Sequence, residues 1–327
     1  MGCEIMEDIK VSLICTLKNE ELSIGEFLDS LLSQSRQPDE IIIVDGGSTD
    51  GTVDIIKSYI EQHGAPIKLI IKNGANIAQG RNIAIKNAKY DIIASTDAGC
   101  KVDENWLQNL VIPFEKDPNV DVVSGWYEAN INTDFEKCVV ELTYPKLEQI
   151  IKSQDDFLPS SRSVAYKKDC WEKIGGYPEW LYTAEDTLFD LNLKKAGCKF
   201  VFASDAIVRW DVRPNVKSTL KQHYLYARGD GHAKLYFKSY LLNIGLHGIG
   251  TLMLIAGFMF HSIWILLLVL LFIYLFKPTL RVYNAIKIPM AIYLIPFIVL
   301  MVDLARLIGY SIGILQRKSR LSSYSKK

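Results

Sequence analysis

The sequence predicts an α/β fold with a Rossmann-like, doubly wound and mostly parallel sheet, followed by C-terminal transmembrane helices. Two observations predict it. Short apolar, strand-like runs alternate with helical runs from Val11 to Thr96, which is typical of β-α-β units. After Tyr240 charged residues nearly vanish, although the chain of 327 residues is balanced overall, with 37 basic and 37 acidic residues. Because that balance gives no general attraction to a polyanion, we expect no nucleic-acid partner.

The first elements follow one another as strand and helix. Val11–Thr16 is short and apolar, and Leu22–Ser35 has apolar residues at helical spacing. Glu40–Asp45 contains the run IIIV, which is typical of a buried parallel strand. The next elements expected are the helix Thr52–His63, the strand Ile67–Ile71, the helix Ile77–Ala88 and the strand Asp91–Thr96. From Trp106 to Tyr240 the pattern is mixed, with strands expected over Val120–Ser124 and Phe200–Ala203 and helices over Thr183–Ala196 and Asn215–Tyr236.

The C-terminal part predicts membrane helices. Leu241–Phe276 is 36 residues without a formal charge. As one straight helix it would measure about 54 Å, against about 30 Å of hydrocarbon. We therefore expect two spans, at about 241–258 and 261–277, with a break near His261 and Ser262. A third apolar segment, 288–315, contains Asp303 and Arg306, which are three residues apart and could pair on one helix face.

Basic residues predict the topology. Lys277–Lys287 and Gln316–Lys327 are both basic, so we expect both on the cytoplasmic side. One full span over 288–315 would place the tail outside, so a re-entrant or interfacial segment, or a tight hairpin, is expected there. The N-terminus lacks the apolar core of a signal peptide, and Met6 stands where N-myristoylation of Gly2 needs Ser or Thr. The expected parts are a cytoplasmic α/β domain over 1–238, a membrane region over 239–316 and a basic cytoplasmic tail over 317–327, in a multi-pass protein of the cell membrane.

The cysteines are scattered. Because none forms a C-x-x-C pair, we expect free thiols in a reducing compartment and no zinc site. They are Cys3, Cys15, Cys100, Cys138, Cys170 and Cys198.

Polar residues follow the expected strands, and ligands of doubly wound sheets bind at those carboxyl ends. Asp45 ends the second strand, where it could accept hydrogen bonds from a base or a ribose. The glycines after it permit close approach of the backbone, and Ser48 or Asp50 is expected to cap the next helix. Asp97 repeats this placement after the fourth strand. It could hold a divalent metal bound to a diphosphate, since Mg²⁺ commonly takes one or two carboxylates.

Glu185 and Asp186 lie at the start of an expected helix. Adjacent helical residues point about 100° apart, so one can face the site while the other supports it. Asp186 is the candidate general base that would take a proton from an acceptor hydroxyl. The alternative is that both acids are simply favoured in a first turn by the helix dipole, and composition alone favours that alternative.

Five strings occur in order at a characteristic spacing: VSLICTLKNEE, IIIVDGGSTDGT, GRNIAIKNAKYDIIASTDAG, SSRSVAYKKDCWEKIGGYPEWLYTAEDTLFD and QHYLYARGDG. Each string alone is weak to moderate, while the ordered set is specific. Together, over about residues 9–235, they resemble the family-two inverting glycosyltransferases with a GT-A fold.

The resemblance implies a role for each motif. Thr16, Asn19 and Glu20 would line the nucleotide pocket, and Asp45 would contact the base. Asp97 would bind the metal, Mg or Mn, that the diphosphate carries. The remaining implied roles are Arg81 on the nucleotide-sugar, Ser161 and Arg162 facing the donor sugar, Asp186 as base beside Glu185, and Gln222 and Arg228 in a loosely matching acceptor or phosphate segment.

Two departures from the family pattern change what we expect. The usual Asp-x-Asp reads Asp97-Ala98-Gly99, and Cys100 is too soft to replace the second carboxylate. Asp103 could assist, but we expect it to cap the helix that starts at Glu104. The Gln-x-x-Arg-x-Trp signature of processive synthases is absent, which favours an enzyme that adds a single sugar.

The resemblance therefore implies a hexosyltransferase-type enzyme. It would move one sugar from a nucleotide-sugar donor to a hydroxyl of a lipid-linked or glycan acceptor, in cell-envelope polysaccharide or glycoconjugate synthesis. The metal and Arg228 would offset charge on the leaving group. Two alternatives stay open: a polyprenyl-phosphate monosaccharide synthase, and a catalytically silent subunit of a membrane export complex. A nucleotidyltransferase would need a basic glycine-rich first loop, whereas LKNEE is acidic.

Overall fold

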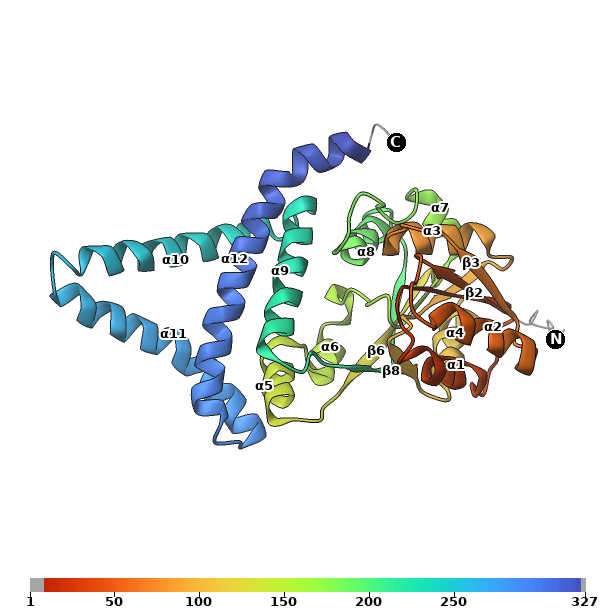
Figure 1. The fold of residues 1–327 in the computed structure, drawn as a ribbon, viewed down its shortest axis with the longest axis horizontal. Coiled ribbons are helices and arrows are strands. Elements are labelled where there is room, and N and C mark those ends of the chain that lie inside the picture. The colour runs from red at the N-terminus through yellow and green to blue at the C-terminus, as the bar shows by residue number, and fades with distance from the viewer. Residues whose placement is uncertain (1–8, 325–327) are drawn as a thin grey trace. The chain divides into compact units, whose positions relative to one another are not determined.

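The computed structural model describes residues 9–324, so Gly2 and Cys3 lie outside the described part of the chain. The chain divides into two units (Figure 1). The first comprises residues up to Asn130 together with Lys146–Asp211, and the second comprises Ile131–Pro145 and the residues from Val212 onward. The boundary that the sequence suggests, after residue 238, falls inside the second unit and stays a prediction.

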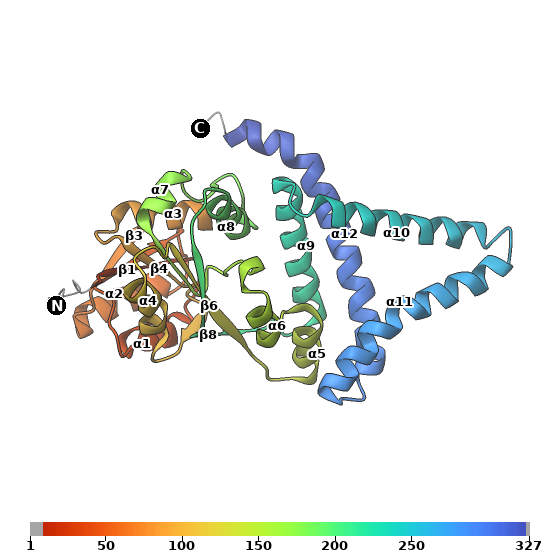
Figure 2. The same cartoon turned by 180° about the vertical axis from the view of Figure 1, so that it is seen from behind.

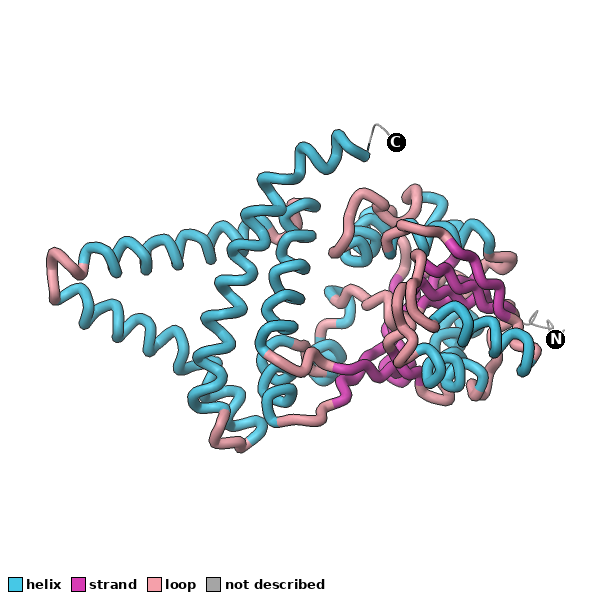
Figure 3. The backbone as a smooth tube through the Cα atoms, viewed as in Figure 1, coloured by secondary structure: helices cyan, strands magenta, loops and turns pink. Residues whose placement is uncertain are grey.

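The first unit is built on one sheet, whose strand order over the described residues is β3-β2-β1-β4-β7-β6-β8-β5 (Figure 3). The first four strands are β1 (Val11–Leu17), β2 (Glu40–Asp45), β3 (Ile67–Ile71) and β4 (Ile92–Ser95). They pair in parallel, and Ile41, Ile42 and Ile43 are completely buried. The α/β prediction is therefore confirmed, because an apolar run fits a strand covered on both faces.

The second half of the sheet is mixed. Its strands are β5 (Cys100–Val102), β6 (Val122–Asn130), β7 (Val164–Lys167) and β8 (Phe200–Asp211). β7 runs antiparallel to β4 and β6, and β8 runs parallel to β6. The sequence analysis missed β5 and β7, since three or four residues are too few to show a period. It also found only the first residues of β8.

Along the chain, the helices of the first unit alternate with these strands. They are α1 (Ile24–Leu32), α2 (Thr52–His63), α3 (Ile77–Asn87), α4 (Trp106–Lys116), α6 (Leu147–Lys152), α7 (Lys168–Lys173) and α8 (Glu185–Lys195), with a 3₁₀ turn at Gln154–Asp156. α3 begins with a capping box of Asn76 and Gln79. It lies so close to β1 that a Cβ on Gly80 would stand 2.7 Å from Cγ2 of Thr16. α8 starts two residues later than expected, because Ala184 is left-handed with a φ of 63°.

The second unit is helical. It contains α5 (Asp134–Thr143), α9 (Val216–Ala233), α10 (Phe237–Ala256), α11 (Ser262–Ile286) and α12 (Ala291–Tyr324). The last three are each long and apolar enough to cross a membrane. The break between α10 and α11 falls at residues 257–261, where the sequence analysis expected it.

The third apolar segment differs from the expected hairpin. α12 is one continuous helix of 34 residues, even with Pro296 inside it, so the tight-hairpin expectation is wrong. Asp303 and Arg306 are also not an ion pair among the described residues. Asp303 accepts a hydrogen bond from the hydroxyl of Tyr274 on α11, and Nη2 of Arg306 lies 3.3 Å from Nδ1 of His223 on α9. Asp303 and Arg306 therefore contact side chains on neighbouring helices instead of each other.

Helices α9 and α12 lie side by side in both views (Figure 2). Glycines allow this approach: a Cβ on Gly309 would clash with the carbonyl oxygen of Tyr224, and one on Gly313 with that of Arg228. On the other side of the contact, a Cβ on Gly231 would clash with the carbonyl oxygen of Tyr310. Gly309 and Gly313 form a Gly-x-x-x-Gly stripe, the spacing that lets helix backbones touch.

We expect Gly313→Ala to destabilise the full chain in detergent by about 1–3 kcal/mol, because the added methyl group overpacks the contact between α9 and α12. Gly245→Ala on α10 is the matched control, since no atom lies within 4 Å of the Cβ that it would add. There the better helix propensity of alanine should leave stability unchanged or slightly higher. Thermal unfolding of both variants measures this, and equal melting temperatures would contradict the close contact.

Candidate functional site

The loops after β1 and β2 are joined to each other. Asn19 is left-handed, with a φ of 57°, and its backbone N–H donates to Oγ of Ser48 at 2.8 Å. Its own Oδ1 accepts from the backbone N–H of Thr49 at 2.9 Å. The backbone N–H of Glu20 donates to Oγ1 of Thr52, also at 2.8 Å. Asn19 and Glu20 are therefore held at the carboxyl end of β1, just after Thr16 near the end of that strand, and their contact with a nucleotide stays a prediction.

Asp45 is fully buried at the end of β2. Its Oδ1 accepts hydrogen bonds from the backbone N–H groups of Gly47 and Ser48, both at 2.9 Å, and the hydroxyl of Ser48 donates to Oδ2. The carboxylate thus holds the turn that shapes this loop. Its contact with a base stays a prediction. The cap of α2 is Gly51 rather than Ser48 or Asp50, although Asp50 accepts from the backbone N–H of Thr52 at 3.2 Å.

Arg81 joins three of the predicted motifs. Its side chain is 4% exposed, and its Nη1 lies 2.8 Å from Oε1 of Glu185. Its Nη2 lies 3.1 Å from Oδ1 of Asp97, and its guanidinium lies over the ring of Tyr177 at 5.3 Å. Burial alone would lower the pKa of Arg81, but Asp97 and Glu185 raise it above its ordinary value. The group therefore stays charged, and α3, the end of β4 and the start of α8 meet at one cation.

The two acidic residues at the start of α8 have different surroundings, as their adjacent positions on a helix predict. Glu185 is buried against Arg81, and Asp186 is partly exposed and accepts from the backbone N–H of Thr187 at 2.8 Å. Burial and then the neighbouring Asp186 raise the pKa of Glu185 to about 7, while Arg81 opposes this rise. Of the two carboxylates, Asp186 is therefore the one that is open to solvent.

A second guanidinium lies beside Asp97. Nε of Arg162 is 3.9 Å from Oδ2 of Asp97, and the Arg162 guanidinium lies over the ring of Trp210 at 4.7 Å. The side chain of Asp97 is 36% exposed, so the carboxylate is open to a ligand on one side. Ser161 is buried next to Arg162. Two cations at a carboxylate near the strand ends suit a diphosphate that arrives with a metal ion.

Glu20 lies near the position of the missing second carboxylate. Its Oε2 is 4.0 Å from the point that a Cβ on Gly99 would occupy. At present this oxygen accepts a hydrogen bond from the hydroxyl of Ser23 at 2.6 Å. A second carboxylate therefore lies near this loop, and hard carboxylate oxygens are the ligands that a divalent cation prefers. Asp103 does not belong to this set, because its carboxylate pairs with Arg209 instead; it also does not cap α4, whose N-cap is Asn105.

Two of the described cysteines lie in a group with a carboxylate. The five in the described residues are free. Asp121, Cys170 and Cys198 place ligand atoms within 4.8 Å of one another. However, the two Asp121 oxygens already accept from Nζ of Lys167 and the backbone N–H of Lys199, and burial raises the pKa of the Cys170 thiol. A protonated thiol is a poor metal ligand.

Two of the predicted residues belong to the second unit. Gln222 and Arg228 lie on α9, where Nε2 of Gln222 donates to the hydroxyl of Tyr226 at 3.0 Å and the Arg228 guanidinium lies over the ring of Tyr224 at 5.9 Å. Their contact with an acceptor or a phosphate stays a prediction.

Sequence reasoning missed the aromatic residues of the site. Tyr177 and Trp210 lie under Arg81 and Arg162. It also missed Asp190, which is buried one turn after Asp186 and whose pKa is raised, first by burial and then by Asp186. Tyr177 lies inside a quoted motif string, but no local pattern says that its ring supports a cation.

Comparison with known proteins identifies the family of this domain. Residues 12–174 match the family model described as Glycosyl transferase family 2. The chain is 26% identical over 234 residues to glycosyltransferase AglE of Haloferax volcanii, a match that covers 67% of this chain and 72% of that protein. It is also 26% identical over 211 residues to the O-antigen chain rhamnosyltransferase RfbN of Salmonella typhimurium, covering 62% of this chain and 66% of that protein.

A solved structure supports the fold. The mannosyltransferase PcManGT of Pyrobaculum calidifontis, solved in complex with GDP-Man and Mn²⁺, aligns with a TM-score of 0.54 at 19% sequence identity. The alignment covers 97% of this chain and 75% of that one. At this identity the likeness establishes the GT-A fold.

We expect Arg81→Met to destabilise the full chain by about 3–5 kcal/mol, because it leaves the buried carboxylate of Glu185 without its cation. Lys101→Met is the matched control, because Lys101 pairs with Glu26 at 2.9 Å on the surface, with both side chains more than half exposed. Solvent screens such a pair, so its loss should cost far less. Chemical unfolding of the two variants compares them, and similar losses would show that Arg81 does not organise the site.

Proposed function

Because the chain carries a glycosyl transferase family 2 domain, we propose that it moves one sugar from a nucleoside-diphosphate sugar to an acceptor hydroxyl, with inversion. The acceptor is a lipid-linked or free glycan, and the product belongs to a cell-envelope polysaccharide or glycoconjugate. The observation that carries this proposal is the Arg81 cluster. Asp97 and Glu185 both contact this buried cation, which supports a donor diphosphate at Asp97 and an acceptor at Asp186, the residue next to Glu185.

The reaction is a single in-line displacement. Asp186 accepts the proton of the acceptor hydroxyl as that oxygen attacks the anomeric carbon. The bond from this carbon to the diphosphate oxygen breaks, and the nucleoside diphosphate leaves with the bonding electrons. Arg81 and Arg162, both beside Asp97, offset the charge that builds on the diphosphate. Glu185 holds the guanidinium of Arg81 in place and so positions its positive charge.

A divalent cation, when bound, shields the diphosphate and makes it a better leaving group. Asp97 and Glu20 would hold it. Arg162 lies 3.9 Å from Asp97 and would meet the same phosphate oxygens. We infer Mg²⁺ or Mn²⁺, because both accept hard oxygen ligands and leave positions for phosphate and water.

The membrane arrangement is also part of the proposal. We infer that α10 and α11 cross the membrane as a pair, with the first unit on the cytoplasmic side. α12 packs through Gly309 and Gly313 on α9, a helix with several charged residues that does not suit hydrocarbon. The part of α12 around Gly309 and Gly313 is then an interfacial helix and not a membrane span. The basic tail therefore stays on the cytoplasmic side, which satisfies the positive-inside rule.

We expect Asp186→Asn to retain donor binding but to lose transfer by a factor of about 10² or more, because the amide cannot accept the proton. A screen of nucleotide-sugars against a membrane lipid extract provides the assay, and calorimetry measures donor binding. Asp156→Asn, an exposed position in the 3₁₀ turn, is the matched control.

Full transfer by the Asp186 variant would contradict the base assignment. It would favour a polyprenyl-phosphate acceptor, whose phosphate oxygen needs little help from a base. If the unaltered chain neither transfers sugar nor hydrolyses any donor, a catalytically silent subunit becomes the better reading.

We expect Glu20→Gln to weaken Mn²⁺ binding about tenfold and Asp97→Asn to abolish it, because the first removes one of two charged ligands and the second removes the central one. Electron paramagnetic resonance of free Mn²⁺ with the nucleoside diphosphate present measures this without any turnover. Glu26→Gln, on the surface of α1, is the control. If Glu20→Gln binds Mn²⁺ like the unaltered chain, Asp97 is the single protein carboxylate on the metal.

A further inference from the structure

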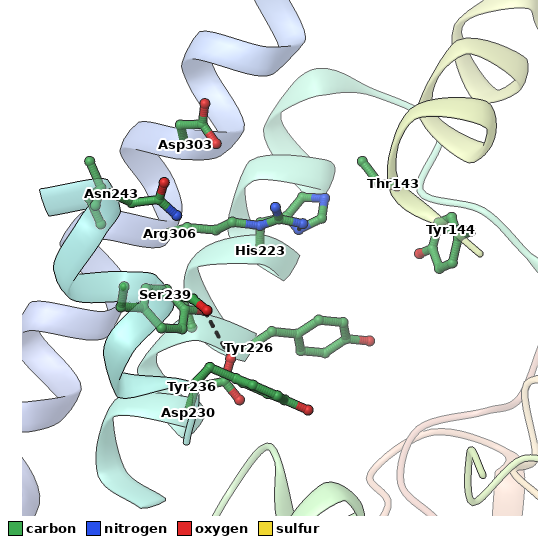
Figure 4. A pocket seen from close by; sticks show the side chains of 13 residues that line it. Thr143, Tyr144, His223, Tyr226, Asp230, Tyr236, Ser239, Asn243, Asp303 and Arg306 are labelled. Atoms are coloured by element: carbon green, nitrogen blue, oxygen red, sulfur yellow. Dashed lines mark hydrogen bonds between the residues drawn. The ribbon is translucent and has the colours of Figure 1, made fainter. Parts of the chain in front are cut away.

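The second unit contains a cavity of about 410 Å³ (Figure 4). Its lining comes from the end of α5 and from α9, α10 and α12, all within this unit. The volume is in the range of small-molecule sites, about 300–1,000 Å³. No residue placed in the Arg81 cluster lines it. The side chains that carry the argument are His223, Tyr226, Asp230, Tyr240, Asn243 and Arg306.

The charged side chains that line this cavity disfavour an anionic ligand. Its charged lining residues are Asp230, Asp303 and Arg306, so the formal charge is one positive minus two negative, or −1. His223 adds none, because burial and then Arg306 lower the pKa of its imidazole to about 4. A phosphate head group would meet two carboxylates and a single guanidinium. The lining therefore favours a neutral ligand.

Polar groups and aromatic rings both line the cavity. Oδ2 of Asp230 accepts from the hydroxyl of Tyr240 at 2.9 Å, and Nη2 of Arg306 lies 3.3 Å from Nδ1 of His223. The side chain of Asn243 adds an amide, which can both donate and accept. Tyr226 and Tyr236 are 44% and 53% exposed, so their rings are open to a ligand.

These are the groups that a sugar needs. Vicinal hydroxyls both donate and accept, and so they match carboxylate, amide and guanidinium groups placed side by side. The apolar C–H face of a pyranose packs on an aromatic ring, and tyrosine also offers a hydroxyl at the edge. A purely hydrocarbon ligand would offer no hydrogen bond to the side-chain amide of Asn243, and covering such a group without a partner is costly.

The cavity lies beside the start of the first apolar helix. Asn243 is in the second turn of α10, next to Leu241 and Leu242, which are 55% and 75% exposed. A ligand with a sugar at one end and a hydrocarbon chain at the other could place its chain along this apolar surface.

We propose that this cavity binds an uncharged sugar residue of the glycan acceptor, separately from the site that holds the nucleotide-sugar. The inference rests on the proposed function, because it gives the acceptor of that reaction a binding site. The same sugar chemistry can come from a lipid-linked glycan or from a free one, and the apolar surface beside Asn243 favours the lipid-linked form.

The experiment uses the full chain in lipid nanodiscs and measures sugar binding by saturation-transfer NMR. The probes are methyl and dodecyl glycosides of glucose, galactose, mannose, rhamnose and N-acetylglucosamine. We expect at least one sugar to bind, and Tyr226→Ala and Asn243→Ala each to weaken it about tenfold or more. Tyr293→Ala on α12 is the control, because its ring is 68% exposed and does not line the cavity. Dodecyl phosphate, which carries no sugar, should not compete.

Each outcome decides a point. Tighter binding of the dodecyl glycoside supports a lipid-linked glycan, and equal binding of both supports a free one. If no glycoside binds, if dodecyl phosphate displaces the sugar, or if the two cavity variants bind like the Tyr293 variant, the proposal is overturned. Donor hydrolysis and transfer are measured on the same samples. A chain that transfers sugar without cavity binding refutes only this proposal, while binding without transfer refutes only the proposed reaction.

Discussion

A positive charge withdrawn from water needs partners, and this requirement organises the first unit around Arg81. Its guanidinium is shared by Asp97 and Glu185, which come from different motifs. Removing Arg81 would leave the carboxylate of Glu185 buried without its cation, whereas Asp97 is 36% exposed and also lies 3.9 Å from Arg162.

Much of the fold could be predicted from local patterns. The IIIV run of β2 and the alternation after it indicated a parallel sheet, because burial on both faces leaves a continuous apolar strand. Interest in Asp97 followed from the rule that ligands bind at strand ends, and interest in the Glu185–Asp186 pair from its place at the start of an expected helix. What could not be predicted was pairing across the chain. Nothing near Asp103 in the sequence shows that Arg209 takes its carboxylate, and nothing near Gly99 shows that Glu20 lies beside it.

In the second unit, too, local patterns could be predicted and contacts across the chain could not. Hydropathy was enough to place the break between α10 and α11, since length against bilayer thickness decides that question. It could not assign the third segment, because the behaviour of α12 depends on which helix it contacts. A local signal did exist in Gly309 and Gly313, whose spacing is that of a close helix contact. The charges of Asp303 and Arg306 likewise serve partners on α11 and α9, so reading them as a local pair was wrong.

The contact between α9 and α12 also bears on how the protein can be handled. A fragment that ends before Phe237 contains the whole first unit and the charged helix α9, and by hydropathy it looks like a natural water-soluble piece. Yet it would lack the helix that covers Gly231 and the backbone beside Tyr224 and Arg228. This uncovered surface of α9, which packs against α12 in the full chain, favours self-association of the fragment. Preparations that retain the C-terminal helix, even at the cost of detergent, should therefore stay monodisperse where the shorter fragment aggregates.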